Sequence, residues 1–244
     1  MLPTISLGPL VLPTIGVVYL VGLWFSLNQA ERGARRLGLN AETVYGLAVT
    51  GLVAGLIGGR LLFVFEYWAA FQENLISIVW PLNNGYNLMG GLFFGAAGAF
   101  FYGRSKTLPP ATTLDALAPG LITAFIALSL ADFLAGPGYG TVSRVPWAIS
   151  VFSVLRHPVQ VYEMILGLLA LLLYWRIVDR RAFPGQPFLL IIAFYSAGRL
   201  FLDAFRGNAV LTSGGYHVTQ LVAFAVMMGC LLLLARMSLR VEKG

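Results

Sequence analysis

The chain has 244 residues, of which 58% are hydrophobic and 11% are charged, and its formal net charge is +6. Soluble domains carry a charge on roughly a quarter of their residues. This composition, with a mean hydropathy of +0.81, therefore excludes an ordinary cytosolic globule, a disordered tail and a secreted disulfide scaffold. Several apolar runs approach the roughly 20 residues that a helix needs to cross a bilayer. The sequence predicts an all-α polytopic membrane protein.

Seven apolar segments are predicted to be transmembrane helices, because unsatisfied backbone polar groups are costly in lipid. They cover residues 10–28, 44–65, 87–103, 112–134, 159–177, 187–205 and 215–236. Residues 1–244 are predicted to form a single transmembrane domain. The single cysteine, Cys230, allows neither an internal disulfide nor a cysteine-based metal cluster. We expect no metal site and no cofactor.

Basic residues concentrate in alternate loops, which predicts the orientation of the chain. Eleven of the 16 lie in loops at one end of the segments or after the last one: Arg32, Arg35, Arg36, Arg104, Lys106, Arg176, Arg180, Arg181, Arg236, Arg240 and Lys243. The opposite loops hold only Arg144, Arg156 and Arg206. The positive-inside rule then places the N-terminus outside and the C-terminus in the cytoplasm. Because these charges sit in short loops between apolar runs, no nucleic-acid partner is expected.

Two outer segments are longer than tight turns. Residues 66–86 and 135–158 are rich in aromatic side chains and weakly charged, a composition that suits the headgroup layer of a membrane. We predict that they form a partly structured lid on the outer face.

Glycines recur every four residues in two neighbouring segments, at 51, 55 and 59 and again at 91 and 95. Small residues at this spacing favour close packing between membrane helices. The same glycines could instead leave room for a lipid chain, and the sequence does not separate these two interpretations.

Six ionisable residues lie within or at the edges of the apolar segments. They are Arg60, Asp115, Asp132, Glu163, Arg199 and Asp203. A charge at membrane depth normally faces a cavity or a partner, so pairing among themselves is one explanation. Arg199 could pair with Asp203 one turn later, and Asp203 is also within reach of Arg206. As a group these residues predict a polar cavity that opens to the outer leaflet.

A polar string stands where the second outer segment meets the fifth apolar run. Residues 156–163 read Arg-His-Pro-Val-Gln-Val-Tyr-Glu. Pro158 suits the first turn of a helix, so Gln160, Tyr162 and Glu163 would lie in the following turn, with His157 just before it.

With this string, the sequence resembles the prolipoprotein diacylglyceryl transferases of bacterial inner membranes. The matching motifs are Tyr19–Gly22, Gly58–Leu61, Met89–Leu92, Asp115 with Ala118 and Pro119, Arg156–Glu163, Tyr195 through Arg199 and Asp203 to Arg206, and Gln220. The resemblance implies a seven-helix fold with periplasmic additions in the bacterial plasma membrane. It also implies transfer of a diacylglyceryl group from phosphatidylglycerol to the lipobox cysteine of a preprolipoprotein.

The resemblance also suggests roles for individual residues. It implies that Arg199 and Arg206 contact the lipid phosphate, and that His157 or Glu163 is the base that assists the thiol. The residues expected to be catalytic are His157, Glu163 and Arg199. The residues expected to bind substrate are Arg60, Asp132, Gln160, Tyr162, Asp203 and Arg206.

The chain departs from the family pattern at several positions. Met89 stands where the family has a histidine, Ser129 where it has an arginine, and Asp132 where it has an asparagine. Methionine cannot transfer a proton, and serine cannot hold a phosphate as a guanidinium does. An alternative function is therefore a lipid-binding or accessory subunit of a larger membrane complex. A transporter would share the polar cavity, but the sequence lacks the repeats common in that class.

Overall fold

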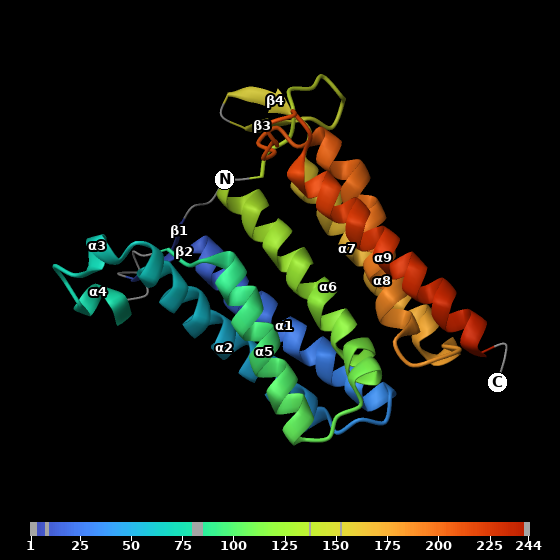
Figure 1. The fold of residues 1–244 in the computed structure, drawn as a ribbon. Coiled ribbons are helices and arrows are strands. Elements are labelled where there is room, and N and C mark those ends of the chain that lie inside the picture. The colour runs from blue at the N-terminus through green and yellow to red at the C-terminus, as the bar shows by residue number, and fades with distance from the viewer. Residues whose placement is uncertain (1–3, 8–9, 80–84, 137, 152, 242–244) are drawn as a thin grey trace.

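The structure is a computed structural model and describes residues 4–7, 10–79, 85–136, 138–151 and 153–241. Long helices account for most of these residues (Figure 1). The long helices are α1 (Thr14–Arg36), α2 (Ala41–Glu66), α5 (Leu88–Ser105), α6 (Pro110–Ala135), α7 (Val159–Ile177), α8 (Gln186–Leu202) and α9 (Val218–Val241). Among the described residues, five helices are long and apolar enough to cross a membrane: α2, α6, α7, α8 and α9. The chain is thus a largely helical, multi-pass membrane protein.

The first helix differs from the predicted segment at both ends. Residues 10–13 form the strand β2 (Leu10–Pro13), which pairs in antiparallel fashion with β1 (Thr4–Leu7). The predicted start at residue 10 was therefore wrong, and α1 begins directly after Pro13, whose backbone is extended. The helix also continues to Arg36, eight residues beyond the predicted end. Apolar content alone identified the hydrophobic middle of this helix and missed its polar last turns.

The two outer segments contain short elements. Residues 66–86 include α3 (Trp68–Phe71) and α4 (Ile76–Val79), while residues 80–84 lie outside the described part. Residues 135–158 include the antiparallel pair β3 (Ile149–Val151) and β4 (Val154–Arg156). Two short 3-10 turns, η1 (Val178–Arg180) and η2 (Asp203–Phe205), follow α7 and α8.

Helix α6 lies between two groups of helices (Figure 1). Helices α1, α2 and α5 are on one side of it, and α7, α8 and α9 are on the other. The larger buried core forms between α6, α7 and α8 and consists of Ala118, Ile122, Ala170, Tyr174, Val178 and Ile191. Asp115 braces the same interface, because its buried carboxylate accepts the backbone N–H groups of Gly185 and Phe188 at 2.7 and 2.9 Å, where α8 begins.

The glycine-rich faces of α2 and α5 approach each other closely. A Cβ atom on Gly55 would lie 2.9 Å from the carbonyl oxygen of Gly91, and one on Gly95 would lie 3.0 Å from that of Gly51. Close packing therefore holds for this helix pair. The same glycines also border an apolar cavity of about 610 Å³ between α1, α2, α5 and α6, so the two interpretations of the glycine pattern are compatible.

Candidate functional site

Glu163 lies where three helices meet. It is on the first turns of α7, and its side chain is 4% exposed. One carboxylate oxygen, Oε1, is bound by Arg199 from α8 and by Arg206, which follows η2. The other, Oε2, accepts a hydrogen bond from the Ser129 hydroxyl on α6 at 3.2 Å. The charge of this buried carboxylate is thus compensated by two cations and one neutral hydrogen-bond donor.

The polar contacts continue from Arg206 through Asp203 to His217, just before α9. Arg206 Nε lies 3.6 Å from Asp203 Oδ1, and Asp203 Oδ2 lies 2.9 Å from His217 Nδ1. Asp203 is fully buried. Of the two pairings expected within the sixth segment, that between Asp203 and Arg206 is present, whereas Arg199 pairs across to Glu163. We call Ser129, Glu163, Arg199, Asp203, Arg206 and His217 the Glu163 cluster.

Asp132 faces the cluster through a glycine turn. Helix α6 ends at Ala135 and is followed by Gly136, which has a φ of 99°, while Gly138 has a φ of 72°. A Cβ atom on Gly138 would lie 3.1 Å from Asp132 Oδ2 and 3.2 Å from Arg206 Nη1. Glycine therefore serves two needs here, since it tolerates the left-handed backbone and leaves space for both charged groups.

The outer segment is tied to the cluster by backbone hydrogen bonds. The amide of Thr141 donates to the carbonyl of Phe205 at 2.7 Å, and that of Gly207 donates to the carbonyl of Tyr139 at 2.9 Å. On the other edge, the amide of His157 donates to the carbonyl of Thr141 at 3.0 Å. Residues 139–142 thus run between the segment that carries Arg206 and the segment that carries His157.

An aromatic hydrogen-bond chain borders a groove beside α7. Trp147 Nε1 donates to the Tyr162 hydroxyl at 2.6 Å, and this hydroxyl lies 3.2 Å from His157 Nδ1. These three residues line a groove of about 520 Å³, which we call the aromatic groove. Its remaining walls come from α7, α8 and η2: Ile165, Leu166, Leu169, Gly198, Phe201, Leu202 and Phe205. A mostly apolar groove with polar groups at one end suits an amphipathic ligand.

The guanidinium groups of the cluster are more accessible than its carboxylates. The side chains of Arg199 and Arg206 are 21% and 16% exposed, whereas those of Glu163 and Asp203 are 4% and 0% exposed. Buried acids thus hold two partly accessible arginines in place. An anionic ligand would meet the cations first.

Two predicted site residues, Gln160 and Arg60, have other surroundings. Gln160 is almost completely buried on α7. The Arg60 guanidinium donates to three backbone carbonyls of the first outer segment: Nε to Ile78 at 2.9 Å, Nη1 to Gly85 at 3.0 Å, and Nη2 to Ser77. These contacts hold Ser77, Ile78 and Gly85 against α2.

Sequence reasoning did not single out His217 or Ser129 as site residues. His217 stands alone before the last helix, and no local pattern links it to Asp203. Ser129, which the resemblance matches to a family arginine, contacts Glu163 through its hydroxyl at 3.2 Å. Met89, which the resemblance matches to a family histidine, lies on the first turn of α5 and is 70% exposed.

Comparisons with known proteins agree in one family. A family model described as prolipoprotein diacylglyceryl transferase matches residues 3–236. Similar relatives are named phosphatidylglycerol–prolipoprotein diacylglyceryl transferase. The protein from Clostridioides difficile is 26% identical over 88% of this chain and 86% of its own length. That from Tropheryma whipplei is 28% identical, over 94% and 90% respectively. Since the family model covers nearly the whole sequence, this chain belongs to the prolipoprotein diacylglyceryl transferase family.

Proposed function

We propose that this protein transfers a diacylglyceryl group from phosphatidylglycerol to the cysteine thiol of a preprolipoprotein lipobox. The observation that carries the proposal is the pair of partly accessible arginines, Arg199 and Arg206, held by buried Glu163. An apolar groove of suitable size for an acyl chain lies along the same two helices, α7 and α8. The relatives are named for the transfer of diacylglyceryl from phosphatidylglycerol to a prolipoprotein. Cations beside an apolar groove suit the phosphate and the acyl chains of that lipid.

The proposed setting is the bacterial plasma membrane, with all seven long helices spanning it. The N-terminus is outside and the C-terminus is in the cytoplasm, as the distribution of basic residues favours. The Glu163 cluster then lies toward the outer leaflet. The described parts of the outer segments 66–86 and 135–158 cover this face, and the second segment is hydrogen-bonded to the residues around Arg206.

The arginines act on the phosphate of the lipid substrate. Guanidinium N–H groups bind phosphate oxygens through charge-assisted hydrogen bonds. In the reaction, the thiol sulfur forms a bond to the terminal glyceryl carbon, and the bond from this carbon to the phosphate oxygen breaks. Glycerol phosphate leaves with the electron pair of that bond. Arg199 and Arg206 stabilise the charge that develops on it.

His157 is the better placed of the two candidate bases. The Glu163 oxygens already accept from two arginines and Ser129, so its role is to hold the cations. The imidazole of His157 lines the aromatic groove, and its Nδ1 contacts the Tyr162 hydroxyl. With Nδ1–H donating to this oxygen, Nε2 accepts the thiol proton.

The remaining predicted residues support these groups. Tyr162 orients His157 and is itself fixed by Trp147. Asp203 and Asp132 flank Arg206 and set its position. Arg60 holds the first outer segment against α2.

The test is a transfer assay with purified protein in phosphatidylglycerol liposomes and a lipobox peptide. We expect the mass of a thioether-linked diacylglyceryl peptide. Removing one donor that stabilises developing charge lowers the rate roughly 10²–10³-fold. The transfer rate of Arg199→Ala should therefore fall by about this factor. Arg199→Lys should keep part of the activity, because lysine keeps the charge but not the planar fork.

The matched control is Arg240→Gln, which removes an exposed charge at the last turn of α9 and should leave the rate unchanged. A folded wild-type protein that yields no product under these conditions would overturn the proposal. Equal rates for Arg199→Ala and wild type would remove Arg199 from the site.

A further inference from the structure

A pocket lies between the last turns of α1 and the end of α7. It is lined by Gln29, Arg32, Arg35, Arg36 and Trp175 and has a volume of about 510 Å³. We call it the basic pocket. Twelve residues separate Trp175 from Glu163 along α7, which is about 18 Å of helix. The basic pocket is therefore distinct from the Glu163 cluster and lies toward the opposite end of the helices.

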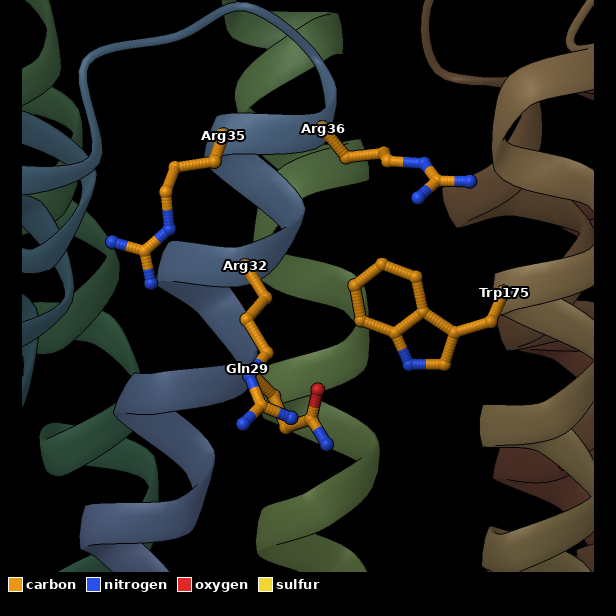
Figure 2. A pocket seen from close by; sticks show the side chains of 5 residues that line it. All are labelled: Gln29, Arg32, Arg35, Arg36 and Trp175. Carbon is orange, nitrogen blue, oxygen red and sulfur yellow. The ribbon is translucent and has the colours of Figure 1, made fainter.

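Two of its three arginines already have acidic partners. Arg36 forms a forked pair with Asp179, with Nε at 2.8 Å from Oδ1 and Nη2 at 2.5 Å from Oδ2. Arg35 lies 3.2 Å from Glu31. In Figure 2, Arg36 extends toward α7 above Trp175, whereas Arg35 points the other way. Within the described part of the chain, Arg32 has no ion pair or hydrogen bond, so the basic pocket retains one uncompensated cation.

Two neutral polar groups at this pocket also lack partners. Gln29 Oε1 is buried, and no donor among the described residues reaches it. A buried acceptor without a donor is costly. Trp175 extends from α7 toward α1 (Figure 2), with its ring packed edge-to-face on Tyr174. Its indole N–H has no acceptor within the residues that the structure describes.

We propose that the basic pocket binds the headgroup of an anionic phospholipid from the leaflet at this end of the helices. The Arg32 guanidinium and the Trp175 N–H bind the phosphate, and Gln29 Oε1 accepts a hydrogen bond from a headgroup hydroxyl. A lipid fits better than a soluble anion for two reasons. Tryptophan favours the membrane–water interface, and basic pockets between membrane helices are typical sites for anionic headgroups. This site is separate from the proposed transfer reaction.

The experiment measures retention of phosphatidylglycerol by the full-length protein in native mass spectrometry. Arg32→Gln is compared with Arg240→Gln, which removes a charge outside the basic pocket. Both changes are made in the wild-type protein and in the Arg199→Ala variant. Comparing the two backgrounds distinguishes lipid bound at the basic pocket from lipid bound at the Glu163 cluster. Phosphatidylcholine and inorganic phosphate are the zwitterionic and soluble probes. Thermal unfolding confirms that each variant is folded.

We expect Arg32→Gln to weaken retention by roughly tenfold or more in both backgrounds, as for loss of a hydrogen bond to a charged group. Arg240→Gln should have no effect. Trp175→Phe, which keeps a ring but loses the N–H, should weaken retention by a smaller factor. Phosphatidylcholine should not be retained at this site, and inorganic phosphate should not displace phosphatidylglycerol at equal concentration.

Equal retention by Arg32→Gln and Arg240→Gln would overturn the proposal. Displacement by inorganic phosphate at equal concentration would overturn it in favour of a soluble anion site. Loss of all bound lipid in Arg199→Ala alone would show that the basic pocket holds none. Conversely, a loss caused by Arg32→Gln but not by Arg199→Ala would support this site while contradicting phosphate binding at the transfer site.

Discussion

The helices on the two sides of α6 are joined by different chemistry. Helices α2 and α5 meet through glycines, with the backbone of one against the backbone of the other. Across α6, helices α7 and α8 meet through Glu163 and its arginines. The first contact depends only on the absence of side chains. The contact between α7 and α8 depends on buried charges. Removing one of them leaves its partner uncompensated, which lowers the stability of the protein.

Both contacts stabilise the fold, but only one of them carries side chains suited to the proposed reaction. The glycine contact offers no ionisable or hydrogen-bonding side chain, although its glycines border the apolar cavity between α1, α2, α5 and α6. The Glu163 cluster presents partly accessible cations supported by buried acids, and it is therefore where the proposed reaction belongs. The two contacts should respond differently to substitution.

The largest expected effect is at Glu163. Glu163→Leu leaves Arg199 and Arg206 facing each other without their shared acid, and removal of one member of a buried ion pair costs roughly 3–5 kcal/mol. Denaturant-induced unfolding in detergent measures this loss. Adding Arg199→Leu should recover part of the stability, because it removes an uncompensated charge.

A second pair of variants identifies the partner of Arg199. If Glu163 is that partner, adding Asp203→Ala to Arg199→Ala should give no recovery. Recovery in this double variant would contradict the cross-helix pairing and favour a pair within α8 and η2.

A smaller loss is expected from Gly55→Leu in the glycine contact. The new side chain would overlap the backbone of α5, because the Cβ position is already 2.9 Å from the Gly91 oxygen. Overpacking costs about 1–3 kcal/mol. The matched control is Gly229→Leu on α9, where a Cβ would have no described neighbour within 4 Å. Equal unfolding midpoints for the two variants would contradict close packing of α2 on α5.

The smallest effect is expected where a pair of an arginine and a carboxylate is exposed. Arg36 and Asp179 form a forked ion pair, but their side chains are 55% and 48% exposed. Exposed pairs contribute little, because water and salt screen them. Asp179→Asn should leave the thermal unfolding temperature in detergent unchanged. A drop comparable to that of Glu163→Leu would show that burial does not distinguish these two pairs.

The two contacts also differ in how well they could be predicted. The four-residue glycine spacing predicted close packing, because it depends on local periodicity within each helix. The partner of Arg199 was not predicted, because Glu163 lies 36 residues away and the closer Asp203 satisfied the spacing rule within one helix. Arg60 shows the same limit, since its acceptors are backbone carbonyls that have no sequence signature.

The long helices themselves followed from apolar content, with ends shifted by up to eight residues. Apolar content could not detect the polar last turns of α1 or the strand that replaces its predicted start. The position of residues 139–142 beside Arg206 depends on backbone hydrogen bonds between distant segments, which no local pattern encodes.

The order of charges along the chain bears on how the protein enters the membrane. During synthesis, α7 emerges with Glu163 before Arg199 and Arg206 have left the ribosome. An acidic side chain is costly in lipid without its partners. We therefore expect α7 to wait at the insertion machinery until α8 arrives, so that the two helices enter the bilayer together as a hairpin. Truncation between them should leave α7 poorly inserted, and neutralising Glu163 in the truncated chain should restore its insertion.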